Sequence, residues 1–135
     1  MFVDASAIVA IMLAEEDGER LLADLPMDGT SITSPIALYE ATLAIARKSN
    51  ASVIVALEEV KKFLDKAAVE IVPIETEHGD LALETYSAFG KGRHPAALNM
   101  GDCFAYAVAK KGNKKILFTG DDFTKTDLGY LGTIQ

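Results

Sequence analysis

The sequence lacks the features that mark secreted and membrane proteins. It holds a single cysteine, Cys103, so a disulfide framework and a cluster of thiolate metal ligands are both excluded. No apolar run is long enough to span a bilayer, and a strand pattern that begins at the first residue leaves no room for a signal peptide. We therefore expect a soluble protein in a reducing, cytoplasmic compartment, with no membrane partner.

Positive charge is also scarce. The chain has 13 lysines and arginines against 20 aspartates and glutamates, which gives a net charge of −7. This balance argues against tight, sequence-independent binding of nucleic acid over the whole surface. The sequence leaves three explanations of the acidity open, namely solubility, a face for a basic partner, or carboxylates gathered around a divalent cation.

The sequence also lacks the motifs of nucleotide phosphate binding by a Walker loop and of covalent catalysis by a serine or cysteine nucleophile. The segment from Gly90 to Pro95 contains glycine and lysine but lacks the spacing of a Walker phosphate-binding loop. The chain has no Gly-x-Ser-x-Gly nucleophile elbow and no histidine evidently paired with Cys103. No covalent protein nucleophile is therefore expected.

What the sequence does contain is an alternation of apolar strands and helices. Its 135 residues, half of them apolar, predict a single domain over residues 1–135. The alternation predicts an α/β fold with helices packed on the faces of a parallel sheet. The expected strands are 2–4, 31–33, 70–74, 115–119 and a last short one at 132–135, and the expected helices are 5–14, 19–24, 35–48, 52–67, 77–87 and 99–109, with a solvated turn at 15–18.

Four acidic residues occupy unusual positions in this pattern. Asp4 and Asp121 each follow an apolar strand, Asp102 lies in the first turn of a helix, and Glu40 projects from an otherwise apolar helix face. Each position also has an explanation that needs no bound ligand. Asp4 can cap the next helix, and Asp102 can interact favourably with the helix dipole. Glu40 can extend to water from an edge position.

The joint placement of these acids suggests a cation site. The carboxyl ends of parallel strands meet at one edge of a sheet, where ligands bind in open α/β folds. Carboxylates packed together repel one another and take up protons unless a cation lies between them. Oxygen ligands of this kind suit Mg2+ or Mn2+. Such an ion activates water and neutralises an attacked phosphate, so the pattern indicates phosphodiester cleavage.

The motifs also resemble a known family, the PIN-domain ribonucleases, and within it the toxins of the VapBC type of bacterial toxin–antitoxin system. They occur in family order over essentially the whole chain, and the loop from Gly90 to Asp102 is similar to that branch in particular. The motifs that carry the resemblance are Val3-Asp4-Ala5-Ser6-Ala7, Tyr39-Glu40-Ala41, Gly101-Asp102-Cys103-Phe104-Ala105-Tyr106-Ala107 and Thr119-Gly120-Asp121-Asp122-Phe123.

The resemblance implies a three-layer α/β/α PIN-like fold with a short, mainly parallel sheet, and an endoribonuclease that depends on Mg2+ or Mn2+. Asp4 and Asp102 match the principal metal ligands and Glu40 matches a third acid. The fourth acid matches Asp121, with the adjacent Asp122 as the alternative. Two hydroxyl residues match positions that support the site, and these are Ser6 and Thr119.

The resemblance further implies a homodimer and a VapB-like antitoxin partner, in a heterotetramer or a larger assembly. The apolar stripe from Val53 to Leu64 is a candidate for part of the antitoxin groove. An arginine of the antitoxin would then replace the cation among the carboxylates. RNA would approach through local basic residues, Lys91 and Arg93 near Asp102, and Arg47 and Lys48 at the end of the helix that carries Glu40.

Two other functions stay open on the sequence. One is a different Mg2+-dependent phosphotransfer enzyme or phosphatase, although such enzymes often place a second acid two residues after the first, where this chain has Ser6. The other is a non-catalytic PIN-like module that only binds RNA or a protein. The intact acidic positions argue against the second.

Overall fold

A computed structural model describes residues 1–130 of the chain and contains a central, entirely parallel sheet. Five short strands lie in the order β3-β2-β1-β4-β5, so the N-terminal strand is at the centre. Phe2 pairs with Ile32 on one side and with Ile116 on the other. The strands are β1 (Phe2–Val3), β2 (Ile32–Thr33), β3 (Glu70–Ile71), β4 (Ile116–Leu117) and β5 (Gly129–Tyr130). The strand expected at 132–135 lies outside the described residues.

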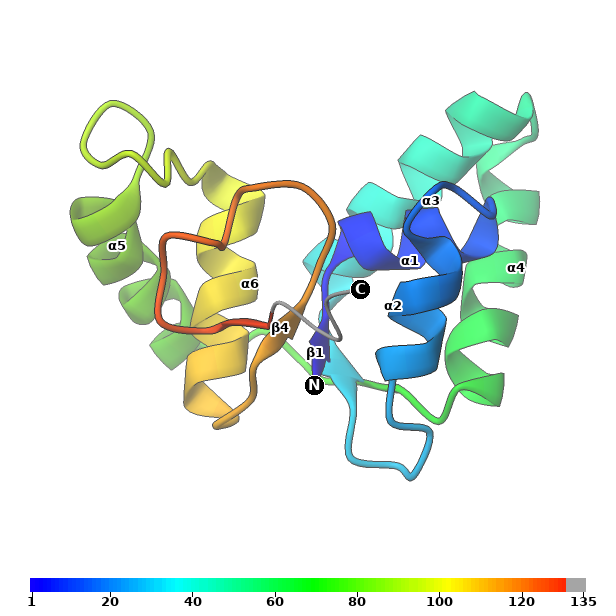
Figure 1. Cartoon of the computed structure of the whole chain (residues 1–135), viewed down its shortest axis with the longest axis horizontal. Coiled ribbons are helices and arrows are strands. Elements are labelled where there is room, and N and C mark those ends of the chain that lie inside the picture. The colour runs from blue at the N-terminus through cyan, green and yellow to red at the C-terminus, as the bar shows by residue number, and fades with distance from the viewer. Residues whose placement is uncertain (131–135) are drawn as a thin grey trace.

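Helices cover both faces of the sheet, so the predicted three-layer α/β/α fold is confirmed (Figure 1). The helices are α1 (Ala5–Met12), α2 (Gly18–Asp24), α3 (Pro35–Ser49), α4 (Val53–Lys66), α5 (Thr76–Phe89) and α6 (Met100–Lys111). Helices α1 to α4 lie on one side, and α5 and α6 lie on the other. No helix within residues 1–130 is long and apolar enough to cross a membrane.

The two-residue period of the strands divides the apolar residues into two cores. Val3 and Leu117 point toward α1, α2, α3 and α4, whereas Phe2 and Ile116 pack with α5 and α6. All four of these side chains are buried. The sheet is therefore covered on both faces, as expected for parallel strands joined by helices.

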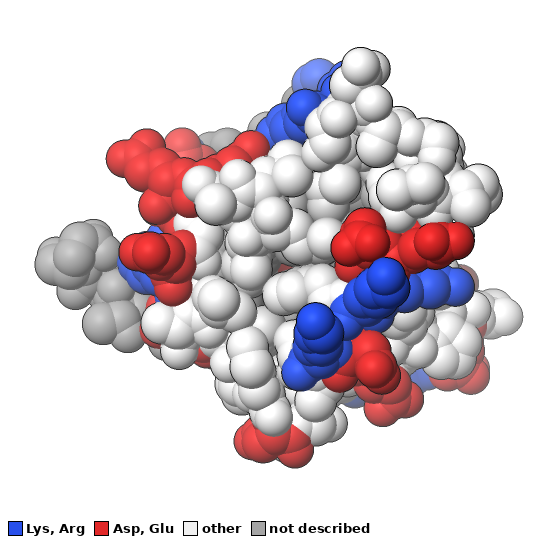
Figure 2. Space-filling view, turned by 90° about the vertical axis from the view of Figure 1, so that its right-hand side faces the viewer, with Lys and Arg blue, Asp and Glu red and all other residues white. Residues whose placement is uncertain are grey.

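The apolar stripe of α4 mostly serves the chain's own core. Ala56, Val60 and Leu64 are buried against the sheet side. Only the first turn leaves large apolar side chains exposed, among them Val53 and Ile54. The prediction that the stripe from Val53 to Leu64 forms part of a partner groove is therefore wrong for its buried residues, Val60 and Leu64. Figure 2 shows this side of the molecule, where acidic and basic side chains alternate beside a broad area that carries neither.

Candidate active site

A cleft of about 360 Å3 opens at the carboxyl edge of the central strands. In Figure 1 the ends of β1 and β4 and the N-termini of α1 and α6 all lie at this upper edge. Five acids line the cleft. Four of them, Asp4, Glu40, Asp102 and Asp122, come from four separate segments, and the fifth, Glu15, is paired with Lys48. The other lining residues are Ala5, Ser6, Val9, Ala44, Lys48, Asn99 and Thr119.

Asp4 lies at the floor of the cleft and also caps α1. Its backbone N–H donates to Leu117 O at 3.0 Å, which fixes it at the end of β1. Its Oδ2 accepts the Ser6 N–H at 3.0 Å and the Ser6 hydroxyl at 2.6 Å. Burial raises the pKa of Asp4 although the hydrogen bonds from Ser6 oppose the rise. The helix-cap explanation and the site explanation are therefore compatible, because one carboxylate does both.

Asp102 is held at the N-terminus of α6 by a reciprocal capping box with Asn99. The Asp102 N–H donates to Asn99 Oδ1 at 2.9 Å, and the Asn99 N–H donates to Asp102 Oδ2 at 3.1 Å. The pKa of Asp102 rises to about 7, chiefly through burial and further through repulsion by Asp122, Asp4 and Glu40. Repulsion of this kind requires that the acids lie close together.

Glu40 reaches the cleft from α3 and lies directly against α6. A Cβ atom added at Gly101 would lie 2.8 Å from the Glu40 Cδ, so only glycine permits this approach. Partial burial raises the pKa of Glu40, and the neighbouring Asp4 raises it further. Gly101 thus allows the carboxylates of Glu40 and Asp102 to occupy the same cleft.

The connection after β4 brings Asp122, rather than Asp121, to the cleft. Asp122 lines the cleft and repels both Asp4 and Asp102. Asp121 is exposed and is not a lining residue; its backbone carbonyl accepts the Thr124 hydroxyl at 2.8 Å in a turn. The two acids are adjacent in sequence, so only the conformation of this turn distinguishes them.

Ser6 and Thr119, the two residues predicted to support the site, connect the end of β4 to Asp4 through hydrogen bonds. Ser6 Oγ accepts the Thr119 N–H at 3.1 Å while it donates to Asp4. The Thr119 hydroxyl donates to Asp17 Oδ2 at 2.7 Å. Neither Asp17, which lies in the turn expected to be solvated, nor Asn99 was among the residues that the sequence singled out.

The sequence predicted Lys91 and Arg93 as the main basic residues that RNA would contact near the site, but the structure places a different lysine in the cleft. Lys91 and Arg93 lie in the loop between α5 and α6 and do not line the cleft. The Arg93 guanidinium lies 5.7 Å from the centre of the Tyr86 ring. Among the described residues, the cation that lines the cleft is Lys48, whose Nζ lies 3.0 Å from Glu15 Oε2.

The chemistry of this donor set fits a small divalent cation. The cleft gathers carboxylate oxygens whose pKa values are raised by burial and mutual repulsion, which a cation would relieve. Within residues 1–130, no three His, Cys, Asp or Glu side chains are arranged to hold a metal ion among them. Mg2+ does not require such a cage, since it retains several waters and is bound through one or two carboxylates.

The chain is similar to known proteins both in sequence and in structure. The family model described as PIN domain matches residues 1–128. The chain is 37% identical over 128 residues to ribonuclease VapC30 of Mycobacterium tuberculosis, with 95% of each chain covered. It is 39% identical to a VapC ribonuclease of Rhizobium meliloti, covering 95% of this chain and 99% of that one. The crystal structure of Mycobacterium tuberculosis VapC20, described as a sarcin-ricin loop cleaving toxin, superposes with a TM-score of 0.76 at 17% identity and 98% coverage of both chains.

Proposed function

This chain belongs to the PIN-domain family, alongside the VapC ribonucleases, and from that premise we propose that it is a metal-dependent endoribonuclease, the toxin of a type II toxin–antitoxin system. The observation that supports the proposal best is the convergence of Asp4, Glu40, Asp102 and Asp122 on one cleft. The substrate is the RNA phosphodiester backbone, and hydrolysis needs no covalent protein nucleophile.

Mg2+ or Mn2+ would be held by Asp4 and Asp102, with Asp122 and Glu40 beside them. When bound, the ion lowers the pKa of water and offsets the negative charge of the attacked phosphate. The chain's own residues orient the carboxylates that would bind the ion. The Ser6 hydroxyl and the Asn99 backbone N–H donate to the carboxylates of Asp4 and Asp102, respectively, and hold them in fixed orientations. Because the pKa of Asp102 is raised to about 7, binding of the cation near neutral pH displaces protons, and the affinity for the cation increases as the pH rises.

RNA approaches an acidic chain through local positive charge, for which Lys48 is the best placed residue. It lines the cleft with Glu40 and Ala44, two helical turns beyond Glu40 and one beyond Ala44 along α3. Its ion pair with Glu15 is exposed and therefore weak, so a phosphate can displace the carboxylate. Lys91 and Arg93, on the loop that leads into α6, would extend this contact with the RNA strand.

The partner proposed for this toxin is a VapB-like antitoxin, as the names of the VapC relatives imply. A basic side chain of the antitoxin placed among the four carboxylates would occupy the position of the cation. We also propose the homodimer and the larger toxin–antitoxin assembly expected from the sequence. The phosphatase alternative gains no support, because the position two residues after Asp4 holds Ser6, whose hydroxyl is bonded to that acid.

Removal of divalent cations is expected to abolish RNA cleavage, and Mn2+ should restore it. The assay follows a labelled RNA incubated with the protein in Mn2+, in chelator, and in chelator followed by excess Mn2+. An Asp65→Asn variant, which changes one exposed acid on α4, serves as the control and should cut as the wild type does. Equal cleavage in chelator would contradict the proposal, and so would a protein that binds Mn2+ but leaves the RNA intact.

Replacement of Gly101 by alanine is expected to lower the rate of cleavage about 10- to 100-fold while the fold stays intact. The new methyl group displaces the Glu40 carboxylate, and a misplacement of about 1 Å in a site can cost ~100-fold. Gly101 is the second residue of α6, where alanine is tolerated at least as well as glycine, so the melting temperature should not fall.

Gly79→Ala on α5 is the matched control for this substitution. A Cβ at Gly79 meets nothing within 4 Å, so the variant makes the same chemical change without displacing a neighbour and should keep full activity. Full activity of Gly101→Ala would show that the position of Glu40 does not matter for the reaction.

A further inference from the structure

The connection that carries Asp122 has no helix to support it. Parallel strands are usually joined by a crossover that contains a helix, but residues 118–128, between β4 and β5, form only turns in the structure. The position of Asp122 in the cleft therefore depends on contacts that the connection makes elsewhere.

One of these contacts is made immediately after Asp122. The Phe123 side chain is fully buried and meets the Phe118 ring edge-on, with 5.3 Å between the ring centres. The Thr126 hydroxyl donates to the carbonyl of Phe123 at 2.8 Å, which closes the following turn. Phe123 anchors the connection in the core on the α6 side of the sheet.

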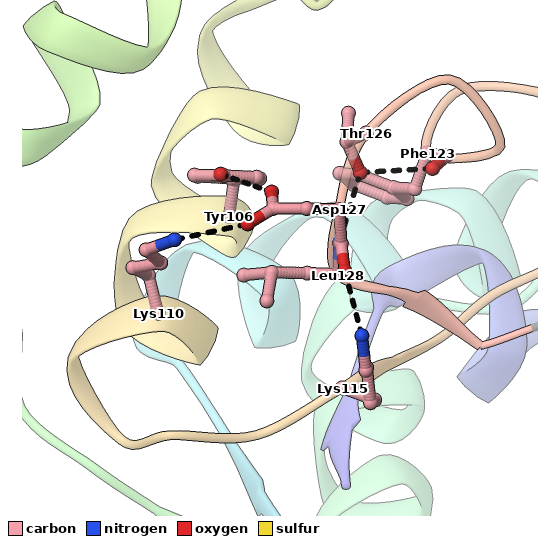
Figure 3. Close-up of polar contacts among 7 residues, drawn as sticks. All are labelled: Tyr106, Lys110, Lys115, Phe123, Thr126, Asp127 and Leu128. Carbon is pink, nitrogen blue, oxygen red and sulfur yellow. Dashed lines mark hydrogen bonds and ion pairs between the residues drawn. The ribbon is translucent and has the colours of Figure 1, made fainter.

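The second contact is made by Asp127, and Figure 3 shows it. The buried Tyr106 hydroxyl donates to Asp127 Oδ1, and Lys110 Nζ lies 2.9 Å from Asp127 Oδ2. Lys115 Nζ donates to the Asp127 backbone carbonyl at 2.6 Å. We refer to Asp127 with Tyr106, Lys110 and Lys115 as the Asp127 clasp. It binds both oxygens of one carboxylate and the backbone of the same residue.

The clasp attaches the connection to the helix that also carries Asp102. Asp102, Tyr106 and Lys110 follow one another at intervals of four residues, so they lie along one face of α6. The connection thus joins this face at Asp127, while Asp122 lies beside Asp102 in the cleft. The distance between these two site acids is set by α6 and by the segment between Asp122 and Asp127.

We propose that Asp127 is a positioning residue for the active site, which holds Asp122 at its place beside Asp102 through the clasp on α6. The inference rests on the proposed function, since it assigns Asp127 a role in cation binding through Asp122. Asp127 itself does not line the cleft and would not touch the cation or the RNA.

A double-mutant cycle on Mn2+ binding tests this role, with the free metal ion measured by electron paramagnetic resonance. In the wild-type background, Asp127→Ala should weaken Mn2+ binding about tenfold, at the lower end of the range for residues that orient ligands. In the Asp122→Asn background the same change should have no further effect, because the acid that it positions is already lost. If Asp127 only stabilised the fold, its replacement would weaken Mn2+ binding by the same factor in both backgrounds.

Tyr106→Phe is the second variant, because it keeps the ring in the core and removes only the hydroxyl. It should weaken Mn2+ binding in the same direction, and amide hydrogens of residues 119–127 should exchange faster in both variants. Asp65→Asn should change neither quantity.

The outcomes separate this inference from the function on which it rests. Unchanged Mn2+ binding in both Asp127→Ala and Tyr106→Phe, or an equal loss with and without Asp122, would overturn the role of Asp127 alone. A wild-type protein that binds no Mn2+ would instead contradict the proposed function, and the inference with it.

Discussion

Replacement of Asp4 by asparagine is expected to lower RNA cleavage about a thousandfold or more. The change removes a negative charge from the floor of the cleft, where charge stabilisation by a bound cation contributes several kcal/mol to the transition state. Each ~1.4 kcal/mol corresponds to a tenfold change in rate. The measurement is the single-turnover rate of cleavage of a labelled RNA in saturating Mn2+.

The same variant should fold as well as the wild type, which separates a chemical effect from a structural one. Asparagine is as good an N-cap as aspartate, and its side-chain oxygen can still accept the hydrogen bonds from Ser6. The substitution also removes a buried carboxyl whose pKa is raised. Since such a group favours folding less as the pH rises through its raised pKa, the cation-free variant should be at least as stable as the wild type at pH 8.

Asp65→Asn provides the matched control, since it makes the same chemical change at an exposed position of α4. Its rate and melting temperature should equal those of the wild type. Cleavage by Asp4→Asn within threefold of the wild-type rate would mean that the activity resides elsewhere than in this cleft.

The second large effect concerns the two adjacent acids after β4. Asp122→Asn should lower the rate at least about 100-fold, the scale of loss for one electrostatic contact in an active site. Asp121→Asn should stay within a few-fold of the wild type. The reason is that Asp122 lines the cleft and repels Asp4 and Asp102, whereas Asp121 is exposed outside it.

The two variants are controls for each other, because they make one identical change at neighbouring positions. Parallel measurements of Mn2+ affinity should rank them in the same order as the rates. A larger loss in Asp121→Asn would restore the assignment that the family motif favoured, and the turn after β4 would then have to rearrange when the cation binds.

Part of this site could be predicted because its signals are local in sequence. Asp4 follows directly on an apolar strand and precedes a helix, so its place at the sheet edge depends on a few neighbouring residues. The helix that carries Glu40 begins where the sequence indicates, at Ser34 and Pro35, and Ser34 accepts the Ala37 N–H at 3.1 Å. With the start of the helix fixed, the direction of Glu40 follows from the 3.6-residue period.

Other parts could not be predicted because they depend on contacts between distant residues. Lys48 reaches the cleft and Lys91 does not, and this depends on how α3 crosses the sheet. The Asp17 carboxylate meets Thr119 across 102 positions of sequence. The α4 stripe has the same pattern whether it packs on its own core or on a partner, and the fold decides that Val60 and Leu64 are buried.

The sequence by itself therefore determined the α/β class, the order of strands and helices from β1 to β4, and the positions of three acids, Asp4, Glu40 and Asp102, whose elements bring them to one edge. It did not predict β5 at residues 129–130. Only the tertiary structure shows that Asp122 lines the cleft and Asp121 does not. These two residues lie in a connection without periodic structure, and no local preference distinguishes them. Their directions are set by Phe123, which is buried in the core, and by Asp127, which is bonded to Tyr106 and Lys110 of α6. These are long-range contacts that form only when the chain is folded.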